Sequence, residues 1–113
     1  MHELEITRSL VNVALDEAKK ANARKLKSVT VVLGEMSGAV DDSVAFYFEL
    51  MTKDTIGEGA KINFRKVPMQ AQCRNCGSTV NPKDIFWECE KCHSMDIEMT
   101  AGKELYIESI EVD

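Results

Sequence analysis

Four cysteines with matched spacing are the clearest chemical feature of this 113-residue sequence. They form two Cys-x-x-Cys pairs separated by twelve residues: Cys73, Cys76, Cys89 and Cys92. A two-residue gap lets both thiolates of one tight turn face the same ion, and Gly77 follows the first pair, where such a turn commonly needs a positive φ. Two such turns complete a tetrahedral shell of sulfur, which Zn²⁺ favours. The spacing therefore predicts a structural Zn²⁺ site.

Other uses of these cysteines fit the pattern less well. A thioredoxin-like dithiol needs one Cys-x-x-Cys pair, and two matched pairs would require two separate redox roles. Iron takes the same four ligands, and the spacing alone leaves it open. A closed four-sulfur site has no coordination position for water, so zinc hydrolase chemistry is not expected. His93 directly follows a ligand and is expected at the surface, where it is a candidate substitute ligand if a thiolate dissociates.

The N-terminus offers a second set of metal donors. The amine of Met1, the backbone nitrogen of His2 and the His2 imidazole can bind one ion together. Glu3 adds a fourth donor through its backbone nitrogen or, alternatively, its carboxylate. All-nitrogen planar coordination suits Ni²⁺ or Cu²⁺ far better than Zn²⁺ or Mg²⁺. A histidine at position 2 is a weak signal by itself, so the interpretation depends on the rest of the chain.

Two segments have the spacing of amphipathic helices. Residues 4–21 carry one apolar stripe and end near Asn22, a common helix stop. Residues 41–53 carry a second stripe, with Asp41 or Asp42 as the expected N-terminal cap. We expect both stripes to pack in the core. Their residues are Ile6, Leu10, Val13, Ala14, Ala18 and Ala21 in the first helix, and Val40, Val44, Tyr47, Phe48 and Met51 in the second.

Three runs rich in β-branched residues predict the strands of this core, at 27–33, 60–67 and 104–112. The side chains expected to face inward in the first two runs are Val29, Val31, Leu33, Ile62 and Phe64. In the third run the inward face switches between Ile107 and Ile110, which predicts a β-bulge. The predicted fold is α/β (α+β): two helices on a three-stranded mixed sheet, with an inserted four-cysteine zinc-ribbon module.

The cysteines lie in an insertion between the second and third predicted strands. We expect residues 1–68 plus 101–113 to form an α/β domain, and residues 69–100, which show little periodicity, to form a zinc-binding module. Pro68 stiffens one connection and Gly102 loosens the other. This predicts a monomer with a mobile zinc module. The alternative is a domain-swapped dimer, in which the third strand completes a neighbour's sheet.

Composition and charge narrow the function classes. The formal net charge of −5 argues against broad nucleic-acid binding, which needs a basic face. Phe86 and Trp87 resemble a base-stacking pair, but acidic residues outnumber basic ones in 69–100, so we expect them to cover the zinc. No apolar run approaches the roughly 20 residues that span a membrane, and the N-terminus lacks the pattern of a signal peptide. Paired cysteines of this metal-binding type indicate the cytoplasm, where thiols stay reduced.

In combination these features resemble the HypA/HybF family of nickel metallochaperones for [NiFe]-hydrogenase maturation. The resemblance rests on Met1-His2-Glu3, the helix that follows, a strand ending in Gly34-Glu35 and the two cysteine pairs. It extends to the closing segment from Gly102 onward, and so covers essentially the whole chain. The paired cysteines alone are shared with many zinc ribbons, whereas their combination with the N-terminal triplet is specific.

The resemblance implies a function and a set of partners. It implies that His2 carries nickel with help from Met1 and Glu3, and that the four cysteines carry zinc. It also implies a GTPase partner, HypB, and delivery to the hydrogenase large subunit. Some family members also supply urease, so urease maturation proteins are further candidate partners. We therefore expect a carrier and not an enzyme. The alternative is a zinc-ribbon adaptor that joins two proteins without nickel transfer.

Overall fold

The computed structural model describes residues 2–80 and 88–113, so Met1, Phe86 and Trp87 lie outside the described residues. In chain order the elements are α1 (His2–Lys20), β1 (Leu26–Gly34), α2 (Asp41–Met51), β2 (Lys61–Val67), β3 (Gln70–Cys73), β4 (Thr79–Val80), β5 (Ile97–Ala101) and β6 (Leu105–Val112). None of the helices in this part of the chain combines the length and the apolar character that crossing a membrane requires.

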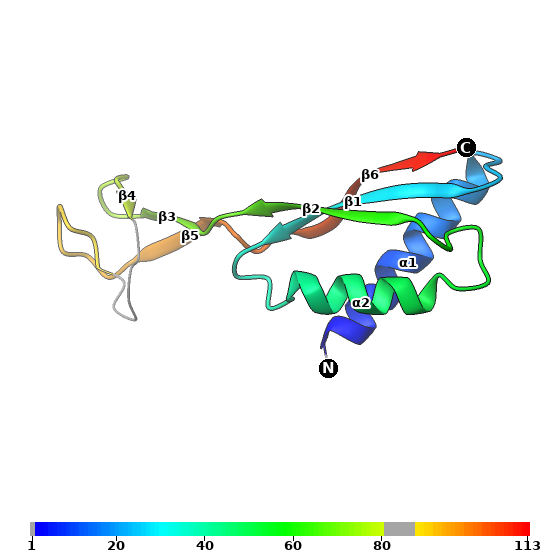
Figure 1. The fold of residues 1–113 in the computed structure, drawn as a ribbon. Coiled ribbons are helices and arrows are strands. Elements are labelled where there is room, and N and C mark those ends of the chain that lie inside the picture. The colour runs from blue at the N-terminus through cyan, green and yellow to red at the C-terminus, as the bar shows by residue number, and fades with distance from the viewer. Residues whose placement is uncertain (1, 81–87) are drawn as a thin grey trace.

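Strands β2, β1 and β6 form the first sheet, in that order. β1 pairs with β2 in parallel and with β6 in antiparallel fashion, and α2 makes the crossover between the two parallel strands. Both helices lie on the same side of this sheet (Figure 1). The predicted α+β fold with a three-stranded mixed sheet is confirmed.

The core lies between this sheet and the two helices. Its fully buried members come from β1 and from the inner faces of both helices: Leu10, Val11, Ala14, Leu26, Val29, Val31, Val44 and Phe48. Ile62 and Phe64 of β2 pack against this cluster, as predicted. The alternation of apolar residues in β1 explains the arrangement, because Val29 and Val31 point toward the helices from the central strand.

The first helix ends as the sequence predicts. Asn22 adopts a left-handed φ of 54°. Its N–H donates to the carbonyl of Lys19 at 2.9 Å, and the N–H of Ala23 donates to the carbonyl of Ala18 at 3.0 Å. This pair of bonds is a Schellman motif, which supplies partners to the last carbonyls of the helix.

The predicted cap of α2 is wrong. Its N-cap is Val40, whose side chain makes no capping hydrogen bond. Asp41 is instead the first helical residue, and its carboxylate lies 2.7 Å from the ammonium of Lys66 on β2. The same carboxylate also accepts the N–H of Asp42 at 2.8 Å. The ion pair therefore ties the start of α2 to the end of β2.

Three residues of the predicted apolar stripes are exposed instead of buried. Val13 is 51% exposed and Val40 is 54% exposed, and Ala21 is also exposed. Val40 lies outside α2, so the helical spacing does not apply to it. Val13 and Ala21 face an open groove of about 580 Å³ between α1 and β6. The stripe of α1 is thus wider than the surface that the sheet covers.

The predicted β-bulge in the last strand is confirmed. Val31 pairs with Ile107, but its neighbour Thr30 pairs with Ser109, which leaves Glu108 as the extra residue. The bulge lets Ile107 and Ile110 both pack against the core. The carboxylate of Glu108 lies 2.6 Å from Nε of Arg65 on β2.

The second sheet contains β4, β3 and β5, and it continues the direction of the first, so the molecule measures 56 × 27 × 16 Å (Figure 1). These short strands are an element that the sequence pattern did not predict. They surround a small cluster of Ala71, Cys73, Val80 and Cys89. The domain boundaries proposed above, between residues 68 and 69 and between 100 and 101, stay a prediction.

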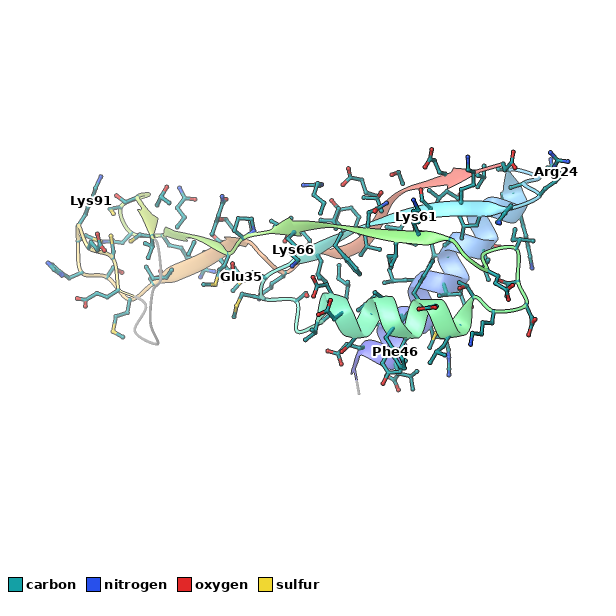
Figure 2. All side chains as sticks on the ribbon, viewed as in Figure 1. Arg24, Glu35, Phe46, Lys61, Lys66 and Lys91 are labelled. Atoms are coloured by element: carbon teal, nitrogen blue, oxygen red, sulfur yellow. The ribbon has the colours of Figure 1, made fainter. Side chains whose placement is uncertain are left out.

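The two connections between the sheets pack tightly against the end of β1. The N–H groups of Gly34 and Met36 donate to the carbonyls of Glu104 and Gly102, each at 2.7 Å. The N–H of Glu35 donates to the carbonyl of Val67 at 2.8 Å. Glu35 and Lys66 are labelled at this junction in Figure 2.

Gly102 does not loosen its connection, contrary to the prediction. It has a φ of +117°, and a Cβ at this position would lie 2.8 Å from the Cα of Met69. A Cβ on Gly34 would lie 2.1 Å from the carbonyl oxygen of Gly102. Glycine is required at both positions because two backbones approach each other closely.

Candidate metal centres

The structure brings the four cysteines together at the far end of the second sheet. Their sulfur atoms all lie within 4.8 Å of one another. Cys73 ends β3 and Cys76 lies in the following turn, whereas Cys89 and Cys92 come from the turn before β5. Two sulfur–sulfur contacts run between the two turns: Cys73 to Cys92 and Cys76 to Cys89, each with a distance of 3.5 Å.

These distances fit a metal ion and not a disulfide. A tetrahedral Zn²⁺ with Zn–S bonds of about 2.3 Å places its sulfurs about 3.8 Å apart. A disulfide needs about 2.05 Å. Two of the four cysteines, Cys73 and Cys89, are buried. The donor set is therefore compatible with a closed, four-sulfur zinc site.

The two cysteine turns are built in the same way. In the first, the N–H of Gly77 donates to the carbonyl of Cys73, and in the second, the N–H of His93 donates to the carbonyl of Cys89, both at 2.9 Å. Gly77 has a φ of 79°, as predicted, and His93 occupies the equivalent position with a φ of 61°. The left-handed residue lets each turn direct both of its thiols to one side.

Hydrogen-bond donors around two of the four sulfurs, those of Cys76 and Cys92, favour the thiolate form. The Ser78 hydroxyl, 3.2 Å from the sulfur of Cys76, and the Ser78 backbone N–H lower the pKa of Cys76 to about 6. The side-chain amide of Asn75, 3.5 Å from the sulfur of Cys92, and the N–H of Ser94 lower the pKa of Cys92. Thiolates are the form that binds metal, so these donors prepare the site for an ion.

These surrounding donors were missed in the sequence analysis, although the sequence contains a signal for them. Each cysteine pair is followed at the same distance by a serine, so the repeated pattern is Cys-x-x-Cys-x-Ser. In both turns the serine carbonyl accepts the N–H of the first cysteine, at 2.9 Å, through Ser78 and Ser94. The repeat therefore reports a repeated local structure as well as repeated ligands.

His93 lies outside the sulfur cluster. Its side chain is 75% exposed, and its Nδ1 lies 3.2 Å from a carboxylate oxygen of Glu88. The group of potential metal ligands found among the described residues contains only the four cysteines. Whether His93 can replace a lost thiolate stays a prediction.

The start of α1 lies at a different part of the molecule, beside α2 (Figure 1). His2 is the first residue of α1, and Glu3 is half-buried in its first turn. Hydrogen bonds to the Glu3 carboxylate, chiefly from its own backbone N–H and also from the N–H of Val40, hold the pKa of Glu3 below its usual range. The start of α1 therefore lies close to the start of α2.

Comparison with known proteins gives one consistent result. A family model described as "Hydrogenase/urease nickel incorporation, metallochaperone, hypA" matches residues 1–112. A hydrogenase maturation factor HypA from Dehalococcoides mccartyi is 41% identical, with 100% of this chain and 95% of that protein covered. One from Caldanaerobacter subterraneus is 40% identical, with 100% of both chains covered.

Two solved structures share the fold. The solution structure of a HypA protein has a TM-score of 0.76 and 28% identity, covering 100% of this chain and 97% of its own. The solution structure of the Ni metallochaperone HypA from Helicobacter pylori has a TM-score of 0.67 and 26% identity, covering 97% and 96%.

Proposed function

The chain belongs to the HypA family of metallochaperones for nickel incorporation, and we propose that it binds Ni²⁺ at its N-terminus and delivers it for [NiFe]-hydrogenase maturation. The observation that carries this proposal is the family match over residues 1–112, which includes both the N-terminal donors and the four cysteines. Because the family consists of metallochaperones, the chain is a maturation factor and not an enzyme.

The proposed nickel ligands are the amine of Met1, the backbone nitrogen and imidazole of His2, and Glu3. Backbone N–H groups in the first turn of a helix have no acceptor four residues earlier, so nickel can replace these protons without breaking the helical ladder. An ion that displaces two amide protons adds no net charge, which avoids the repulsion of a cation by the positive end of the helix dipole. Nickel binding therefore competes with protons, and acid favours release.

The proposed zinc ligands are Cys73, Cys76, Cys89 and Cys92. Bound Zn²⁺ would fix the two cysteine turns against each other and thereby hold β3 and β5 together. The ion is structural, since all four of its ligand positions are filled by protein.

The proposed partners follow from delivery to a hydrogenase. They are the GTPase HypB and the hydrogenase large subunit, with urease maturation proteins as further candidates. We place the protein in the cytoplasm, because a four-thiolate site needs reduced cysteines.

The decisive experiment compares metal content after nickel loading and dialysis in untagged protein with a free N-terminus. His2→Ala should lose bound nickel and keep a full equivalent of zinc. His93→Ala is the matched control, because it removes the only other histidine, and it should keep both metals. Nickel retained by His2→Ala would instead favour an adaptor without nickel transfer.

A further inference from the structure

Exposed apolar side chains gather on α2 and the loop before it. Phe46 is 59% exposed and Leu50 is 45% exposed, and Met36 and Val40 are also exposed. Phe46 and Leu50 are four residues apart, so they lie on one side of the helix, opposite the buried residue Phe48. Figure 2 shows Phe46 projecting from the side of α2 that faces away from the sheet.

The ring of Phe46 contacts the ring of its neighbour. It meets the ring of Tyr47 edge-on, with centroids 5.5 Å apart and planes at 65°. An aromatic side chain that is already fixed loses little conformational freedom when a partner covers it. Such residues are typical anchors of protein interfaces.

The surroundings of this apolar pair are acidic. The sequence contains no lysine or arginine between Lys27 and Lys53, a stretch that includes all of α2. Asp42 and Glu49 are exposed on α2 beside Phe46 and Leu50. Lys66 of β2, which approaches the start of α2, pairs with Asp41 there. A partner surface must therefore supply the positive charges, and a second copy of this surface would place acid against acid.

This surface adjoins the proposed nickel site. Glu3, in the first turn of α1, lies close enough to Val40, at the start of α2, for the Val40 backbone N–H to lower the pKa of its carboxylate. In Figure 1 the first turn of α1 lies on the side of α2 away from the sheet, which is also the side from which Phe46 projects in Figure 2. A protein seated on α2 would thus reach the first residues of the chain.

We propose that Asp42, Phe46, Glu49 and Leu50, called the α2 face below, dock the protein that exchanges nickel with the N-terminus. The partner's contact surface is apolar at its centre and edged by lysine or arginine. The apolar pair supplies the affinity, and the acidic residues supply orientation and fast association. This inference rests on the proposed function, because it takes the N-terminus as the nickel site.

The test measures calorimetric binding of the nickel-loaded full-length chain to the purified GTPase partner. The double variant Phe46→Ser, Leu50→Ser should weaken binding about 30-fold or more, as expected for interface anchors. Val13→Ser on α1 is the matched control, because Val13 is 51% exposed but lies on α1 beside the β6 groove. It should bind as the unmodified chain does. The double variant and the Val13→Ser control should both keep their bound nickel and show the far-UV circular dichroism spectrum of the unmodified chain.

A charge variant tests the second part of the inference. Asp42→Asn with Glu49→Gln should slow association and flatten the dependence of affinity on salt, because the partner's positive charges lose their complement. An unchanged salt dependence would contradict the acidic role assigned to this face.

The outcomes separate this inference from the proposed function. Wild-type affinity in the Phe46/Leu50 variant overturns the docking surface and leaves the nickel site intact. Nickel binding that survives His2→Ala overturns the nickel site alone. If the unmodified chain does not bind the GTPase, the docking proposal fails.

Discussion

Replacing Gly34 with alanine should destabilise the junction between the two sheets. Gly34 has no positive φ, so an added methyl group acts through its volume and not through backbone strain. The new Cβ would lie 2.1 Å from the carbonyl oxygen of Gly102 and 2.6 Å from the nitrogen of Glu104. Both neighbours are backbone atoms, so no side-chain rotation relieves the contact.

The size of the effect follows from what must move. A Cβ essentially never approaches another atom closer than 3.0 Å, so the end of β1 must separate from the Gly102–Glu104 segment by about 1 Å. This movement breaks the two 2.7 Å hydrogen bonds that Gly34 and Met36 donate across the junction. Each lost bond costs about 1–3 kcal/mol when its groups stay buried, so we expect a loss of roughly 2–6 kcal/mol.

The measurement is urea denaturation of the zinc-loaded protein, followed by circular dichroism. The expected loss is a large fraction of the roughly 5–15 kcal/mol that stabilises a typical domain. Gly59→Ala is the control, since Gly59 has a φ of +80° and nothing within 4 Å of the added Cβ. It should lose only about 1–2 kcal/mol, from backbone strain. A Gly34→Ala protein within 0.5 kcal/mol of the unmodified one would refute the reasoning.

Further predictions concern the metals, the core and an ion pair. Cys89→Ala should lose zinc and unfold residues 69–100 while α1 and α2 stay helical. Full zinc occupancy by elemental analysis would contradict the site, unless adding His93→Ala then removed the metal. Acetylation of the N-terminal amine should weaken nickel binding, and equal affinities by calorimetry would exclude the amine as a ligand. Phe48→Ala should reduce the free energy of unfolding by about 3–5 kcal/mol in urea denaturation, because Phe48 is only 2% exposed. The hydrogen bond from Lys66 lowers the pKa of Asp41, so the pair stabilises the fold above the ordinary carboxyl pKa and loses this effect as pH falls through the lowered one. The stability difference between the unmodified protein and Asp41→Asn should therefore be constant from pH 6 to pH 9 and shrink toward pH 2.

Periodic segments were the part of the fold that the sequence could predict. The bulge near Glu108 was readable because apolar residues change from one side of the strand to the other between Ile107 and Ile110. The stop at Asn22 was readable because few residues accept a left-handed φ. Both features depend on a few neighbouring residues, so local physical chemistry determines them.

Features that depend on distant parts of the chain were not predictable. The strands β3 and β4 have four and two residues, too few to show a period. Val13 matches its helical stripe, but its exposure depends on where β6 lies. Gly102 has the same side chain whether it sits in a loose or a tight connection, and only its contact with Met69 distinguishes the two.

The candidate sites show the same division. Matched spacing was enough to group Cys73 with Cys92, because each turn is local and metal chemistry favours a tetrahedral shell. The link between Glu3 and Val40 joins two helices separated by β1, and no local pattern indicates it.

The position of the cysteine cluster in the chain means that bound zinc would affect a sheet that holds none of the proposed zinc ligands. The chain leaves the first sheet after Val67 and returns at Leu105, so residues between them form a loop whose two ends meet beside Gly34. Without order of its own, this loop of 37 residues carries a length-dependent closure entropy of about 3 kcal/mol. When a metal ion holds β3 paired with β5, the only unpaired segments that connect the two sheets are the short ones between β2 and β3 and between β5 and β6. Zinc should therefore act as a cross-link that helps β6 find β1 during folding.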